Sequence, residues 1–116
     1  MDEFAARLRK FGVRTSLADA LYLKGKALLA QNRTDEADET LNQARAEAEA
    51  LGSRRARWPI LAALAEIEAG RGNATQARTL RQQTRDIITY IADHCPPDLR
   101  ASFLSLPDVQ AVVRHA

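Results

Sequence analysis

The feature that most constrains this chain is an internal repeat. When the sequence is aligned with itself at a shift of 40 residues, expected turns coincide, and small or apolar residues coincide with one another. The matched pairs are Leu21 with Leu61, Gly25 with Ala65, Asn32 with Gly72, Ala37 with Ala77, and Ala44 with Thr84. A repeat of this length is one supersecondary unit that buries its apolar face against the next copy. The sequence therefore predicts stacked units.

The composition indicates which kind of unit is repeated. Of 116 residues, 5% are aromatic, and there are only 5 glycines and 4 prolines. Alanine, leucine, arginine and glutamate are abundant, and these residues favour helices over strands. The length suits one domain, and the single cysteine, Cys95, excludes an internal disulfide. We therefore expect one all-α domain.

Capping and turn residues divide the chain into expected helices. Thr34 and Asn73 are predicted to cap helices with their side chains, and Gly52 to end one in the left-handed conformation. Pro59 is expected in the first turn of its helix, where its missing N–H is harmless. The predicted helices span about residues 2–11, 15–30, 35–51, 57–69, 74–95, 98–105 and 107–115.

The spacing of the small residues resembles that of tetratricopeptide repeats. That family places a small residue in the first helix of a repeat, helix A, and an alanine early in the second, helix B. Gly25 with Ala37 and Ala65 with Ala77 have the family's spacing, twelve residues in each repeat. The chain departs from the family pattern in having leucine where helix A often carries an aromatic residue.

The resemblance implies a right-handed α-solenoid of antiparallel helix pairs with C-terminal capping helices. Four segments follow: residues 1–12 as the second helix of a preceding repeat, 15–52 and 54–95 as two repeats, and 96–116 as a cap. The tail from Leu99 to Val109 is similar to the closing segment of large bacterial signalling proteins. The alternative is an ordinary antiparallel helix bundle with accidental self-similarity.

No sequence motif points to catalysis or to a cofactor. The chain has no glycine-rich phosphate loop, no HExxH, no paired CxxC and no nucleophile elbow. His94 and Cys95 are adjacent, but zinc takes three or four protein ligands, and the other histidine, His115, is distant in the sequence. We therefore predict a protein that is not an enzyme and that has no metal and no cofactor.

The charge balance argues against a nucleic-acid or membrane partner. There are 17 Lys and Arg against 15 Asp and Glu, a net charge of +2, and no apolar run approaches the roughly 18 residues of a membrane span. The arginines near Trp58 and along the second repeat could contact phosphates, but acidic residues of the helix over 35–51 are expected to balance them. The N-terminus has no signal-peptide core, so a cytoplasmic location is expected.

The resemblance implies peptide binding through a concave groove lined by the helix A residues. The residues at those positions are Asp19, Tyr22, Lys26, Leu29, Ala62, Glu66 and Ala69. An aromatic, both charges and small residues suit the docking of a peptide or of a neighbouring domain. The alternatives are a spacer or oligomerisation element of a larger signalling protein, whose groove the chain fills itself, and a nucleic-acid-binding helical domain.

The two ends of the array carry different expectations. Apolar tail residues should cover the last helix: Leu99, Phe103, Leu104, Leu106, Val109, Val112 and Val113. At the other end Phe4, Leu8 and Phe11 form an apolar stripe without a preceding partner. This stripe predicts either a longer array or a homodimer through the N-terminal helix.

Overall fold

The computed structural model of the protein describes residues 14–114, with side chains from 17 to 113, and these residues form helices without any strand. The helices are α2 (Arg14–Ala30), α3 (Thr34–Leu51), α4 (Arg54–Gly70), α5 (Ala74–Asp93), α6 (Pro97–Leu104) and α7 (Pro107–Arg114). The prediction of an all-α fold is therefore confirmed for this part of the chain. The expected N-terminal helix, with Phe4, Leu8 and Phe11, lies outside the described residues.

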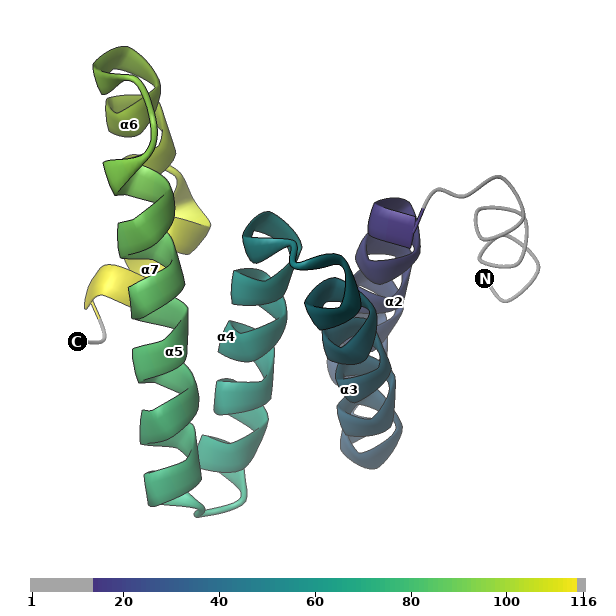
Figure 1. The fold of residues 1–116 in the computed structure, drawn as a ribbon. Helices are drawn as coiled ribbons and strands as arrows, with labels where there is room; N and C mark the ends of the chain where they lie inside the picture. Colours follow the sequence, from purple (N-terminus) through teal and green to yellow (C-terminus); the bar gives the residue numbers. More distant parts are fainter. Residues whose placement is uncertain (1–13, 115–116) are drawn as a thin grey trace.

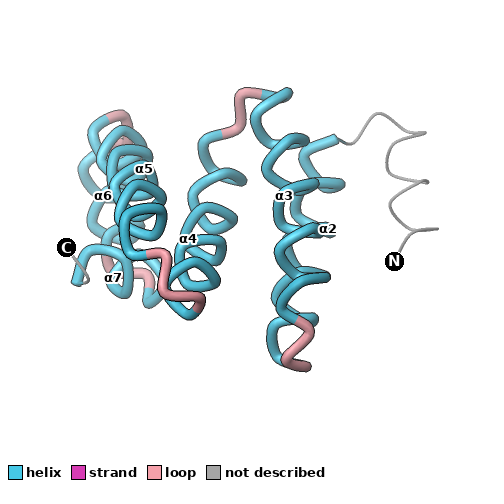
Figure 2. Tube along the Cα trace, turned by 90° about the horizontal axis from the view of Figure 1, so that it is seen from below, coloured by secondary structure: helices cyan, strands magenta, loops and turns pink. Residues whose placement is uncertain are grey.

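The four long helices form two hairpins. Helix α2 packs on α3 and α4 packs on α5, while α3 against α4 joins the two hairpins. The helices follow one another in a row from α2 to α5, and the short α6 and α7 pack on α5 at the end of that row (Figures 1 and 2). Three-residue turns between helices leave the partners of each hairpin antiparallel.

Both hairpins close with the same turn, at the positions that the repeat aligns. Asn32 (φ 60°) and Gly72 (φ 82°) adopt the left-handed conformation. The amide of Arg33 then donates to the carbonyl of Leu28 at 2.9 Å, and the amide of Asn73 donates to the carbonyl of Glu68 at 2.9 Å. This pattern satisfies carbonyls that a helix end leaves open. Gly52 also ends α3 with a left-handed φ of 65°, as the sequence predicted.

Three local predictions were wrong at the helix starts. Thr34 is the first residue of α3 and not its cap. Asn73 does precede α5, but its side chain donates to Glu68 Oε2 at 2.6 Å and makes no capping bond. Helix α4 begins at Arg54, because Ser53 Oγ accepts the amide of Ala56 at 3.3 Å. Pro59 therefore falls in the second turn, where it has no N–H to donate to an earlier carbonyl.

The hairpin crossings depend on small residues. Ala37 and Ala77 are 0% and 1% exposed, which confirms their predicted burial. A Cβ built on Gly25 would lie 2.6 Å from the Leu41 side chain, so a larger residue would force this buried side chain to move where α2 crosses α3. Thr84 is fully buried, and its hydroxyl donates to the carbonyl of Leu80 at 2.8 Å. Its polar side chain is thereby accommodated in the core.

The C-terminal helices cover the second hairpin only in part. Val109 of α7 is 0% exposed, and Phe103 meets the buried Trp58 edge-on, with ring centroids 6.4 Å apart. Leu104 and Val112 are half-buried against the core. The remaining residues of the predicted cover are exposed, and the prediction was wrong for them: Leu99, Leu106 and Val113. Leu99 of α6 and Val113 of α7 lie off the faces that pack on the core, and Leu106 lies between the two helices.

Candidate functional site

A cleft of about 160 Å³ opens between α2, α4, α5 and α7, and we call it the central cleft. Its lining residues are Tyr22, Lys26, Trp58, Pro59, Ala62, Ala63, Glu66, Arg81, Thr84, Asp108, Ala111 and Val112. Four of the predicted groove residues are among them: Tyr22, Lys26, Ala62 and Glu66. These four residues, two from α2 and two from α4, therefore line one cleft.

The other predicted groove residues lie elsewhere. The carboxylate of Asp19 pairs with Arg55 Nη2 of α4 at 3.1 Å, outside the central cleft. Leu29 is half-buried and packs against the core. Ala69 is exposed and borders a separate hollow beside α5. Each of them lies about one helical turn beyond a residue that lines the cleft.

The central cleft combines an apolar base with polar side chains of both charges. Trp58 and Ala63 are buried, whereas Lys26 and Glu66 are exposed. Burial raises the pKa of Tyr22 above its ordinary value of 10.0, and the negative charges of Asp108 and Glu66 raise it further. The Tyr22 hydroxyl therefore stays protonated at neutral pH and remains able to donate a hydrogen bond.

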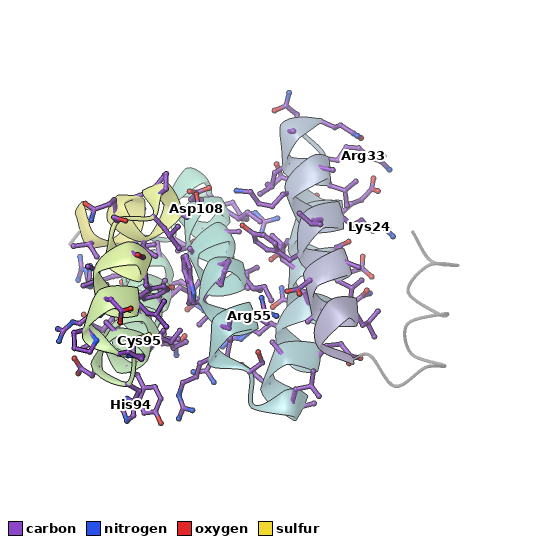
Figure 3. The ribbon with its side chains drawn as sticks, turned by 90° about the horizontal axis from the view of Figure 1, so that it is seen from above. Lys24, Arg33, Arg55, His94, Cys95 and Asp108 are labelled. Atoms are coloured by element: carbon purple, nitrogen blue, oxygen red, sulfur yellow. The ribbon has the colours of Figure 1, made fainter. Side chains whose placement is uncertain are left out.

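Helix α7 is the element of the cleft that the sequence analysis missed. The tail was expected to cover the last helix, yet Asp108, Ala111 and Val112 line the cleft, and Figure 3 shows Asp108 next to α4. These residues have the i, i+3, i+4 spacing of one helix face. That spacing could have indicated a second face on α7, besides the one that carries Val109.

Ion pairs connect the two hairpins. Arg71, after α4, contacts Asp35 at 2.6 Å and Asp38 at 3.1 Å, both on α3. The hydrogen bond to Asp38 is the main reason that the pKa of Arg71 is raised. Arg55 of α4 pairs with Asp19 of α2. Figure 3 shows where Arg55 lies on α4. The expected balancing of arginines by the acidic helix α3 is therefore confirmed for Arg71.

The same expectation was wrong for Arg78 and Arg81. Neither side chain forms an ion pair or a hydrogen bond with any residue that the structure describes. Apart from the pairs with Arg71, acidic side chains of α3 pair locally: Glu49 with Arg45 in the same helix, and Glu36 with Arg33 just before it. The acidic residues therefore leave part of α5 uncompensated.

His94 and Cys95 lie at the end of α5, far from Asp108 in Figure 3. His94 Nδ1 is 2.8 Å from the carbonyl oxygen of Tyr90, and its ring stacks on the Tyr90 ring at 4.0 Å. Between residues 14 and 114 no three His, Cys, Asp or Glu side chains are grouped so as to hold a metal ion. Both of these His94 contacts are with Tyr90, one helical turn earlier.

Compared with family models, with curated proteins and with solved structures, the chain has no match. No helix among the described residues is both long enough and apolar enough to cross a membrane. Function is therefore inferred from the central cleft and the charges around it.

Proposed function

We propose that this chain is a non-enzymatic protein-interaction module that binds a peptide, or a segment of a neighbouring domain, in the central cleft. The observation that carries this proposal is the convergence of Tyr22, Lys26 and Glu66 around an apolar base. Sites for whole small molecules commonly enclose about 300–1,000 Å³. A cleft of about 160 Å³ suits one side chain of a longer ligand better.

A right-handed solenoid of the tetratricopeptide type is part of the same proposal. Its support is that both hairpins close with one kind of turn and cross at small residues. Helix α7 lines the cleft together with α2 and α4, so it extends the wall that the two A helices begin. Stacked helix pairs of this type present a continuous concave surface to their ligands.

The experiment is selection of displayed random peptides on the immobilised protein. Ala62 is half-buried in the cleft, and Ala62→Arg fills the cleft with a long side chain. Ala46 on α3 is exposed outside it, and Ala46→Arg is the matched control for the added charge. The wild type and Ala46→Arg should enrich peptides that Ala62→Arg binds at least about tenfold less tightly.

Two results would contradict peptide binding. One is that no peptide is enriched on the folded wild type. The other is that the enriched peptides bind Ala62→Arg as tightly as the wild type, with equal helical circular dichroism in all three proteins.

One observation favours a second function, a spacer in a larger signalling protein. The chain's own helix α7 forms a wall of the cleft, and its Val112 is half-buried. In that case the cleft is partly filled by the chain itself. The spacer hypothesis expects no enriched peptide and no effect of Ala62→Arg on any interaction.

A further inference from the structure

A second hollow adjoins the central cleft, and we call it the arginine hollow. It is bounded by the end of α4, by Gly72 in the turn, and by Ala77, Arg78, Arg81 and Arg85 of α5. The three arginines are spaced three and four residues apart, which places them on one face of the helix. No carboxylate is among the residues that line this hollow.

Arg78 and Arg81 of the arginine hollow lack the carboxylate partner that most other described arginines have. Most other described arginines contact a carboxylate: Arg33, Arg45, Arg55, Arg71 and Arg100. Arg78 and Arg81 contact no such group among the described residues, whereas Arg85 donates to Gln82 Oε1 at 2.8 Å and has a further partner. Like charges at these helix spacings repel each other. An anion seated between Arg78 and Arg81 would relieve that repulsion.

Comparison of the two hairpins singles out Arg81. Under the 40-residue shift it stands where the first hairpin has Leu41, which is 0% exposed and packs against Gly25. Arg81 is half-buried and borders both the central cleft and the arginine hollow. A position that the repeat pattern assigns to the core is thus occupied by a charged group at a surface. Departures of this kind from a local pattern are expected at functional positions.

The two hollows meet at Arg81, and together they select one kind of ligand. Arg78 and Arg81 are three residues apart, a rise of about 4.5 Å along the helix, which suits a single oxyanion held by both. The adjoining cleft carries Glu66 and Asp108, which would repel the next phosphate of a nucleic acid. A peptide can place an acidic group on the arginines and an uncharged side chain in the cleft.

We propose that Arg78 and Arg81 recognise an acidic group of the bound peptide, a carboxylate or a phosphoryl group, next to the residue that enters the central cleft. The proposal rests on the proposed function and adds the chemistry of the partner. Guanidinium groups bind either oxyanion through paired, charge-assisted hydrogen bonds. Arg81, which reaches both hollows, couples the acidic residue to its neighbour in the peptide.

The test uses labelled peptides that are alike except at one position beside a leucine: glutamate, phosphoserine, glutamine or lysine. Binding is measured by fluorescence anisotropy to the wild type, Arg78→Gln, Arg81→Gln and the control Arg100→Gln, which removes the same charge from α6. The glutamate or the phosphoserine peptide should bind the wild type best. Arg78→Gln and Arg81→Gln should each weaken the binding of that peptide about tenfold, since the loss of a hydrogen bond to a charged group lowers affinity by about that factor. Arg100→Gln should change its affinity less than about twofold.

The outcomes separate this proposal from the proposed function. Equal binding of the glutamate, phosphoserine and glutamine peptides, with Ala62→Arg still blocking all of them, overturns the acidic preference and leaves peptide binding intact. If the wild type binds none of the peptides, both the acidic preference and peptide binding are overturned. A labelled oligothymidylate that binds more tightly than any peptide, and that Arg78→Gln and Arg81→Gln release, would assign the arginines to nucleic acid instead. Preference for phosphoserine over glutamate identifies the phosphoryl group as the source of the charge and supports the proposal.

Discussion

Each hairpin consists of two long helices that are joined by the same kind of turn and cross at matching sequence positions. The hairpins differ in how completely other helices cover them. Helix α4 has neighbours on several sides, and seven of its ten residues from Trp58 to Ile67 are buried. Helix α2 packs on α3 and α4 within the described residues, and its Leu23 is 63% exposed. The comparison teaches that position in the row, and not the repeat itself, decides how much of a helix is core.

The crossings of the two hairpins differ as well. In the first, Gly25 lets α2 approach Leu41 so closely that a Cβ would overlap it. In the second, alanine replaces the glycine and Arg81 replaces the leucine, so a charged side chain extends to the surface hollows. One crossing is therefore closed around an apolar residue, and the other carries a charged residue that borders two surface hollows.

The largest expected effect compares the two alanines at the crossings. Ala37→Leu overpacks a closed site and should lower the free energy of unfolding by about 3 kcal/mol. Ala77 borders the arginine hollow, so Ala77→Leu should cost less, about 1 kcal/mol, because the added carbons have room on that side. Urea denaturation of both variants measures the difference. Equal losses would show that the crossings are equally tight, and a loss of only a few tenths at Ala37 would contradict the repeat alignment.

A second pair of variants exchanges glycine and alanine between the crossings. Gly25→Ala should cost about 2 kcal/mol, because the new Cβ lies too near the Leu41 side chain. Ala65→Gly at the matching position should cost about 1 kcal/mol, the usual penalty for glycine inside a helix. A stabilising Gly25→Ala, seen as a higher thermal midpoint, would mean that α2 and α3 separate at little cost.

The third prediction concerns the cover that only the second hairpin has. Phe103→Ala removes the edge-on contact with Trp58 and should cost about 1 kcal/mol. Trp58 is the only tryptophan, so its emission should shift to longer wavelength as water reaches the ring. Leu99→Ala is the control, because Leu99 is exposed on the same helix. Unchanged emission in Phe103→Ala would place α6 away from Trp58.

The smallest expected effect is a pH dependence of stability that arises from Tyr22 of α2, near Asp108 of α7. The pKa of Tyr22 is raised in the folded protein, so the unfolded chain loses the phenolic proton first as the pH rises above about 10. Tyr22 therefore adds stability below pH 10 that is lost as the pH climbs through the folded pKa. Thermal midpoints should fall less steeply above pH 10 in Tyr22→Phe than in the wild type. Parallel slopes would show that burial and the negative charges of Asp108 and Glu66 do not raise the pKa of Tyr22.

The helices and their turns were predictable because local chemistry decides them. Gly52 and Gly72 end helices where a left-handed residue is required, and Ala37 and Ala77 mark the buried faces. The helix starts were less predictable. Ser53 caps its helix with its side chain, whereas Thr34 and Asn73 make no side-chain cap. Several polar residues near a helix start compete for the same amides, and small differences in backbone geometry choose among them.

Only part of the candidate site was predictable from the sequence. The resemblance to tetratricopeptide repeats predicted Tyr22, Lys26, Ala62 and Glu66 on one surface, and all four line the central cleft. That Asp108 and Val112 complete the cleft depends on how the short helix α7 packs on α5, which periodicity does not show.

The sequence by itself determined the all-α composition, the repeat length and the small residues at the crossings, because each depends on neighbours within a few turns of chain. Only the tertiary structure decided which arginines are paired. Arg71 reaches Asp35 and Asp38 across the hairpins, whereas Arg78 and Arg81 on the next helix meet no carboxylate among the described residues. The physical reason is that ion pairing depends on distances of a few ångströms between segments far apart in the sequence.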